Sequence, residues 1–237
     1  MVRSRKILFV ILLILFQLQL FATSADTTSI IDNIYNYDFI KASEKLANLY
    51  EKNPLISATM NLEIKWWMAI ERGDNRHFSE FLTALNRFEK NSGNDIAIII
   101  SSTYRMRYYA CTGKNYMLPF LFLRVENKIN KTDLASTEAT GTDGYELFIL
   151  YRSFLSLVRN SIIPDIMLSD SGRKQNLIAE IEKVILNGSS ENRTIGRYFL
   201  MKYYLDIEKN KSKACTYLSE LHCQYPNNLI FSQLLTN

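Results

Sequence analysis

Helical periodicity runs along almost the whole chain and constrains its fold more than any other feature. Apolar residues recur every three to four positions, and the segments end at short breaks such as Asn53-Pro54 and Gly73-Asp74. Only 8 Gly and 4 Pro occur among the 237 residues, too few for the turns of an all-β sandwich. The sequence therefore predicts an all-α chain, with helices over residues 27–36, 38–52, 55–72, 75–91, 94–112, 115–131, 144–160, 173–187, 192–208, 211–224 and 228–236.

Helices joined by such short turns pack as antiparallel pairs. The one long polar stretch, residues 130–144, is predicted to be a loop that divides the chain into halves. A second break over residues 161–172 contains Pro164 but also several apolar residues, so we expect it to pack against the domain.

The N-terminus has the pattern of a secretory signal peptide. Three basic residues, Arg3, Arg5 and Lys6, precede an apolar run over residues 7–21, and small residues follow up to Ala25. An uncleaved anchor is the alternative, but this run is shorter than the roughly 20 residues of a spanning helix. We expect residues 1–25 to be removed, leaving an exported chain with no membrane span and one domain over residues 26–237.

The basic character of the chain comes largely from that segment. The formal net charge is +4, from 28 Lys plus Arg against 24 Asp plus Glu. Without residues 1–25, which contain three bases and no acids, 25 bases face 24 acids. The mature chain is then nearly neutral, which argues against a nucleic-acid partner.

The three cysteines do not form a disulfide framework. Cys215 and Cys223 lie eight residues apart on one predicted helix, about 12 Å along its axis, which is too far for a disulfide. Cys111 could pair with either only if the fold brings them together. We expect all three to act as small buried hydrophobic residues.

One spacing of residues occurs twice. The order Ala, three residues, Leu, two residues, Leu, four residues, Pro appears once near each end of the mature chain. A small Ala lets a neighbouring helix approach closely, and both Leu lie on the same helix face. The two copies are 172 residues apart, about five periods of 34. The repeat-packing residues are Ala42, Leu46, Leu49, Pro54, Ala214, Leu218, Leu221 and Pro226.

This pattern resembles the second helix of a tetratricopeptide repeat, although Leu stands where the family's second small residue usually lies. Tyr198, Met201 and Leu205 resemble the first helix, with Lys202 in place of the usual Gly. The order of features resembles the exported tetratricopeptide-like proteins of Bacteroidetes-type bacteria. In this chain the matching features are residues 34–39, Trp66-Trp67, residues 143–145, residues 196–200 and residues 225–228. The resemblance implies a right-handed α-superhelix of antiparallel helix pairs, located in the periplasm or at the outer membrane, with a binding or assembly role and no established chemistry.

No catalytic or cofactor motif is present in the sequence. The two histidines, His77 and His222, are far apart, and no metal-binding spacing, phosphate loop or nucleophile motif occurs. Carboxylate pairs such as Glu180 and Glu182 lie among polar residues on predicted solvated faces. We therefore predict no cofactor, no metal and no enzyme activity, with an all-helical hydrolase as the least favoured alternative.

The aromatic residues are the best candidates for partner binding. Trp66 and Trp67 lie on a helix that is apolar on several faces, which favours the core for both. Tyr and Arg are common at protein interfaces and could line the concave groove of a repeat superhelix, although a single Tyr more often reaches out from the core. The candidate partner-binding residues are Trp66, Trp67, Tyr104, Arg105, Tyr108, Tyr109, Tyr203 and Tyr204.

These features together predict an exported, non-catalytic scaffold that docks a peptide segment or helix of a protein partner. The alternative is a periplasmic protein that binds a glycan or small ligand. An exposed tryptophan platform would favour a glycan, and carboxylates converging in a pocket would favour a hydrolase.

Overall fold

The computed structural model describes residues 29–49, 54–92, 95–131, 141–163 and 171–236. Within these ranges the chain forms helices and the turns between them, which confirms the predicted all-α class. A first helical segment covers residues 29–35. It is followed by α2 (Phe39–Leu49), α3 (Pro54–Arg72), α4 (Asn75–Ser92), α5 (Asp95–Cys111), the 3-10 turn η1 (Asn115–Met117), α6 (Leu118–Lys131), α8 (Gly141–Ile162), α9 (Ser171–Asn187), α10 (Ser190–Lys202), the π-helical turn η2 (Tyr203–Ile207), α11 (Lys211–Gln224) and α12 (Leu229–Thr236).

The helices end where the sequence has stop signals. Gly73 follows α3 and Gly113 lies just after α5, with φ angles of 66° and 71° that glycine adopts without strain. The Asn210 side chain caps α11 by accepting a hydrogen bond from the backbone N–H of Lys213. Pro54 begins α3, where its missing N–H leaves no helical hydrogen bond unmade.

Two predicted segments differ from the structure. The predicted helix over 192–208 is α10 followed by the π-helical turn η2, in which the backbone bonds five residues apart. Both ends of the predicted loop over 130–144 are helical, because α6 runs to Lys131 and α8 begins at Gly141. Residues 132–140, and residues 164–170 of the second predicted break, lie outside the described part of the chain.

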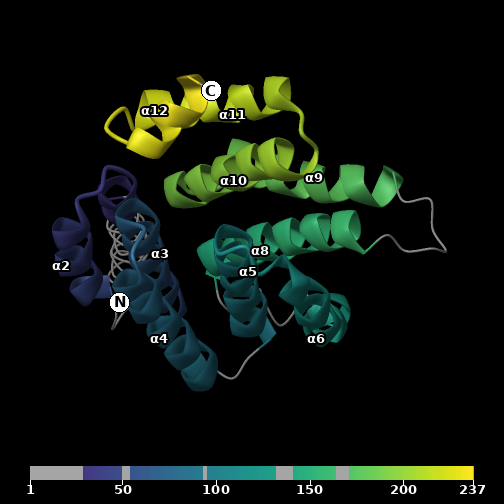
Figure 1. Cartoon of the computed structure of the whole chain (residues 1–237), viewed down its shortest axis with the longest axis horizontal. Helices are drawn as coiled ribbons and strands as arrows, with labels where there is room; N and C mark the ends of the chain where they lie inside the picture. The colour runs from purple at the N-terminus through teal and green to yellow at the C-terminus, as the bar shows by residue number, and fades with distance from the viewer. Residues whose placement is uncertain (1–28, 50–53, 93–94, 132–140, 164–170, 237) are drawn as a thin grey trace, which may run out of the picture.

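Most helices pack on their neighbours in the sequence (Figure 1). In Figure 1, α2, α3 and α4 lie on the left, α5, α6 and α8 lie in the centre and lower right, and α9 to α12 lie along the top. α8 links these groups because it contacts α5, α9 and α10. The core is therefore continuous from the first described helix to the last.

The N-terminal and C-terminal segments meet. Tyr37 donates a hydrogen bond to the Asn228 Oδ1 atom at 2.9 Å, and the Asn228 amide donates to the Tyr35 carbonyl at 2.9 Å. The Tyr35 ring lies 5.1 Å from Tyr225 and 6.0 Å from Phe231, measured between ring centroids. In an open solenoid each repeat contacts only its neighbours, whereas here segments nearly 200 residues apart share one aromatic core.

The two copies of the repeated spacing occupy matching positions. Both alanines and three of the four leucines are buried, and Leu46 is half-buried. The prolines differ in position, because Pro54 begins α3 whereas Pro226 lies in the turn after α11. The residues concerned are Ala42, Leu46, Leu49, Pro54, Ala214, Leu218, Leu221 and Pro226.

The prediction that the cysteines are buried is wrong. Cys111, Cys215 and Cys223 are all free and exposed. Cys215 and Cys223 lie on the outward side of α11, beside Ala214 and Leu221, which take the inward positions. The helical spacing of apolar residues, rather than the burial tendency of cysteine, decides which side of the helix is covered.

Among the described helices, none combines the length and apolar character that crossing a membrane requires. The predicted signal peptide, residues 1–25, lies outside the described residues.

Candidate binding sites

Most of the aromatic residues predicted to bind a partner lie in the core. Trp66, Trp67, Tyr104, Tyr108, Tyr203 and Tyr204 are each at most 9% exposed, so they do not form an outer surface. Tyr109 is half-buried. Arg105, also half-buried, holds Glu89 through two hydrogen bonds of 2.8 and 2.7 Å. Trp66 and Trp67 are the only tryptophans of the chain, so no exposed tryptophan platform for a glycan exists.

A buried carboxylate on α3 organises this core. Glu63 is 1% exposed, and its Oε2 atom accepts hydrogen bonds from Tyr104 at 2.5 Å and Arg107 Nη1 at 3.1 Å. Its Oε1 atom accepts from the Trp67 indole at 2.8 Å and from the Tyr35 hydroxyl at 3.4 Å. One carboxylate thus joins α3, α5 and the first helical segment, and its charge is offset by four donors.

Arg107 on α5 is the cation of this cluster. Its guanidinium carbon lies 4.7 Å from the Trp66 ring centroid and 5.0 Å from that of Tyr198, so aromatic rings contact the planar group. Only Nη1 reaches Glu63; the Nε and Nη2 atoms are buried and have no hydrogen-bond partner among the described residues. The indole N–H of Trp66 is also buried and unpartnered. Such groups are rare in folded proteins and indicate stored strain or the place of a water, an ion or another bound molecule.

The titrating groups around Glu63 respond to burial and charge. Burial, followed by the negative charge of Glu63, raises the pKa of Tyr35 and of Tyr104 well above the usual value. Burial alone lowers the pKa of Arg107, but Glu63 and the neighbouring tyrosines outweigh it, and the net shift is upward. The tyrosines therefore stay neutral donors and Arg107 stays charged.

A cavity of about 290 Å³ lies against this cluster. Arg107, Trp66, Trp67 and Tyr198 line it together with apolar side chains from α5, α8, α10 and α12. The other lining residues are Ile70, Met106, Ala110, Cys111, Phe154, Val158, Met201, Lys202, Tyr203, Asp206, Ile207, Ile230 and Leu234. A mostly apolar cavity with a few converging polar groups is the usual form of a ligand site.

The π-helical turn η2 forms part of the cavity wall. Lys202 precedes η2, Asp206 lies within it, and the two form an ion pair at 2.5 Å. Cys111 at the end of α5 also lines the cavity, and burial raises the pKa of its thiol. π-helical turns often occur at functional sites because they displace side chains from the regular helical positions.

A second, more open groove of about 850 Å³ lies over α3 between α2 and α4. Its apolar lining includes Leu46, Leu55 and Ala58, all half-buried, and small residues Ser43 and Ala47 lie along one side. Leu46 and Pro54 of the first repeated spacing are part of this lining. The groove therefore exposes the side of the first helix pair that a further helix could cover.

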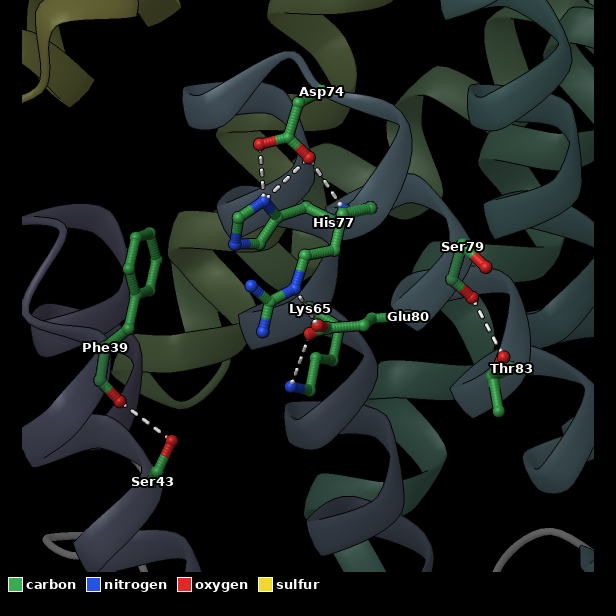
Figure 2. A network of polar contacts seen from close by, with 9 residues as sticks. Phe39, Ser43, Lys65, Asp74, His77, Ser79, Glu80 and Thr83 are labelled. Atoms are coloured by element: carbon green, nitrogen blue, oxygen red, sulfur yellow. Dashed lines mark hydrogen bonds and ion pairs between the residues drawn. The ribbon is translucent and has the colours of Figure 1, made fainter.

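Figure 2 shows a polar network at the start of α4. Asp74 accepts a hydrogen bond from the His77 backbone N–H at 2.9 Å and contacts His77 Nδ1 at 2.8 Å, as an N-terminal cap does. These hydrogen bonds lower the pKa of Asp74. Glu80 in the same network holds Lys65 and Arg76. Among the described residues no cluster of three metal-ligating side chains occurs.

The predicted carboxylate pair and the second histidine do not meet in one site. Glu180 bonds to Arg152 and Ser153, whereas Glu182 accepts a hydrogen bond from the Tyr217 hydroxyl at 3.1 Å. His222 lies on α11, the helix after α10, and its buried Nδ1 atom has no hydrogen-bond partner.

Comparison with protein-family models, with curated proteins and with solved structures gave no match. The function is therefore inferred from the cavity and the groove.

Glu63 and Arg107 were not predicted as site residues from the sequence. Glu63 stands two residues from Lys65 and Arg107 stands among tyrosines, so neither looks buried when read alone. One signal was available: Glu63 and Trp67 are four residues apart on a helix that is apolar on several sides, so a carboxylate there faces other helices.

Proposed function

We propose that this chain is an exported, non-catalytic helical-repeat protein that binds a partner protein. The repeated Ala, Leu, Leu, Pro spacing and the sequential packing of the helices support a right-handed, tetratricopeptide-like arrangement of helix pairs. The proposal depends most on the groove between α2 and α4.

The groove fits a helix of the partner. Small side chains at Ser43, Ala47, Ala58 and Ala84 allow close approach of a second backbone, and Leu55 supplies apolar contact. An amphipathic helix that places its apolar face in such a groove is a common mode of peptide recognition. The groove is wide enough for side chains, since its volume is about 850 Å³.

The charge at the groove selects the partner helix. Arg87 on α4 lines the groove and is exposed. Among the described residues no carboxylate forms an ion pair with Arg87, in contrast to Arg105 on the next helix, which Glu89 holds. A partner helix with an acidic residue beside its apolar face would complete this contact.

A matched pair of substitutions on α2 tests the groove. Ala47 and Asn48 are both exposed, but only Ala47 lines the groove. A photo-crosslinking residue at position 58 in cells of the native host, followed by mass spectrometry, identifies the partner segment. We expect Ala47→Trp and Arg87→Glu to weaken binding of that segment at least tenfold, and Asn48→Trp to leave it unchanged.

Three results would contradict the proposal. They are crosslinking only to residues of this same chain, crosslinking to a segment without an amphipathic helix, and equal binding by the Ala47→Trp and Asn48→Trp variants. A crosslinker at exposed Leu186 on α9 serves as the control for contact by chance.

Export has a separate test. Arg3, Arg5 and Lys6 before the apolar run, followed by small residues up to Ala25, support cleavage by a signal peptidase. N-terminal sequencing of the protein from the cell envelope should begin at Asp26. Recovery in the cytoplasm with the N-terminus intact would reject export.

A further inference from the structure

The cavity beside Glu63 has a polar end built around one guanidinium edge. Arg107 is 8% exposed, and its Nη1 atom is held by Glu63 at 3.1 Å. In a planar guanidinium the Nε–H and one Nη2–H point the same way from a single edge, which matches the two oxygens of a carboxylate. In Arg107 these are the two nitrogens that have no partner among the described residues, and both are covered in this structure, so an acceptor reaches them once a lining side chain shifts.

Three aromatic rings surround the Arg107 guanidinium. The Trp66, Tyr104 and Tyr198 rings lie 4.7 to 5.1 Å from the guanidinium carbon. Trp66 adds its own unpartnered indole N–H to the same cavity. Three buried donors thus have no acceptor within the described chain, a costly arrangement unless an acceptor binds there.

The rest of the cavity is apolar. Phe154, Met201 and Leu234 line it from α8, α10 and α12, and the ion pair of Lys202 with Asp206 adds no net charge. A volume of about 290 Å³ is at the small end for ligand sites, which suits a short alkyl or aryl group. Glu63 retains its bonds from Trp67, Tyr104 and Tyr35, so an added carboxylate on Arg107 leaves it hydrogen-bonded.

We infer that this cavity binds a small amphipathic carboxylate, whose two oxygens accept hydrogen bonds from Arg107 Nε and Nη2 and whose apolar part lies among Phe154, Met201 and Leu234. This site is separate from the groove on α2 to α4 and does not depend on the partner proposed for that groove. The carboxylate could belong to a free acid or to the end of a peptide chain.

Tryptophan fluorescence reports on this site directly, because Trp66 and Trp67 are the only tryptophans and both line the cavity. The purified full chain is titrated with octanoate and with octan-1-ol, which share the alkyl chain but differ in charge. We expect octanoate to change the emission saturably and to bind at least tenfold more tightly than octan-1-ol.

The decisive variant is Arg107→Lys, which keeps a positive charge for Glu63 but removes the planar edge. It should weaken octanoate binding at least tenfold and leave octan-1-ol binding unchanged. Arg105→Lys, on the same helix but outside the cavity, should change neither. Should Arg107→Lys fail to fold, Trp66→Phe removes one donor and should weaken octanoate binding several-fold, with Trp67 as the remaining reporter.

The source of the carboxylate is distinguished with a short peptide that ends in Leu, free or amidated. Competition with octanoate by the free peptide alone assigns the site to a chain end, and failure of both peptides assigns it to a free acid. Equal affinity for octanoate and octan-1-ol, no saturable binding of octanoate, or unchanged octanoate binding by Arg107→Lys would overturn the inference.

Discussion

At the scale of single residues, Glu63 joins several elements of the core. Its four donors come from three helices, and one of them, Arg107, carries a charge that burial would otherwise disfavour. Burying the Glu63–Arg107 ion pair therefore costs free energy, but removing one partner costs far more, because it leaves the other charge buried and unpaired. This asymmetry makes the carboxyl charge testable by an isosteric change.

Replacing Glu63 with Gln should destabilise the protein by about 3–5 kcal/mol, because it leaves the buried Arg107 charge without a counter-ion. The free energy of unfolding is measured by urea denaturation at neutral pH. Glu80→Gln is the control: its ion pairs are solvent-exposed, so its loss should change the free energy of unfolding far less. Equal effects of the two changes would mean that Arg107 is not buried against Glu63.

Alkaline pH should also destabilise the fold. Burial raises the pKa of Tyr37 and of Tyr203 to about 12, whereas unfolded tyrosines ionise near 10. The folded state then holds more protons, so the free energy of unfolding falls as pH rises from about 10 to 12. Urea midpoints at pH 9, 10 and 11 measure this fall, and Tyr37→Phe should make it shallower. A flat profile would show that these hydroxyls ionise freely in the folded state.

At the scale of elements, local signals determine where most helices begin and end. Asn210 is the N-cap of α11, and its side chain accepts a hydrogen bond from the Lys213 backbone N–H. Asn210→Ala should cost about 1 kcal/mol, and Asn210→Asp, which keeps the acceptor, should cost a few tenths at most. Thermal unfolding of the three proteins decides this, and an Asp variant as unstable as the Ala variant would argue against the cap.

The same scale shows what could be predicted from the sequence and what could not. Helical spacing and the breaks at Gly73 and Gly113 predicted the all-α class and most helix positions. The π-helical turn η2 was missed, because nothing in residues 203–207 distinguishes it from a continued α-helix. The aromatic residues were predicted as candidates for partner binding, whereas most of them lie in the core. Their contacts with Glu63 and Arg107 depend on which helices meet, and a short local pattern does not determine that.

At the scale of the whole molecule, the contact between the first helical segment and α12 determines how far a destabilising substitution acts. Asn228 is fully buried, caps α12 through the Phe231 N–H, and bonds to Tyr35 and Tyr37. A solenoid with free ends loses only its terminal repeat when that repeat is weakened. Here α12 and the residue that caps it also contact the first helical segment.

Asn228→Ala should therefore cost about 2–4 kcal/mol, from one cap and two hydrogen bonds to buried groups. Hydrogen exchange should also speed up in residues 29–35, nearly 200 positions away. Asn227→Ala, at the exposed neighbouring position, should do neither. Faster exchange confined to α12 would mean that the ends are stable independently.

The helix α12 forms part of both the aromatic core and the cavity wall. Phe231 packs on Tyr35 and Trp67, whereas Ile230 and Leu234 form part of the cavity wall. A ligand in the cavity would contact the same short helix, α12, that packs against residues 29–35. Ligand binding in the cavity, as inferred above, and the contact of α12 with residues 29–35 therefore share one helix, so each changes the free energy of the other by the same amount.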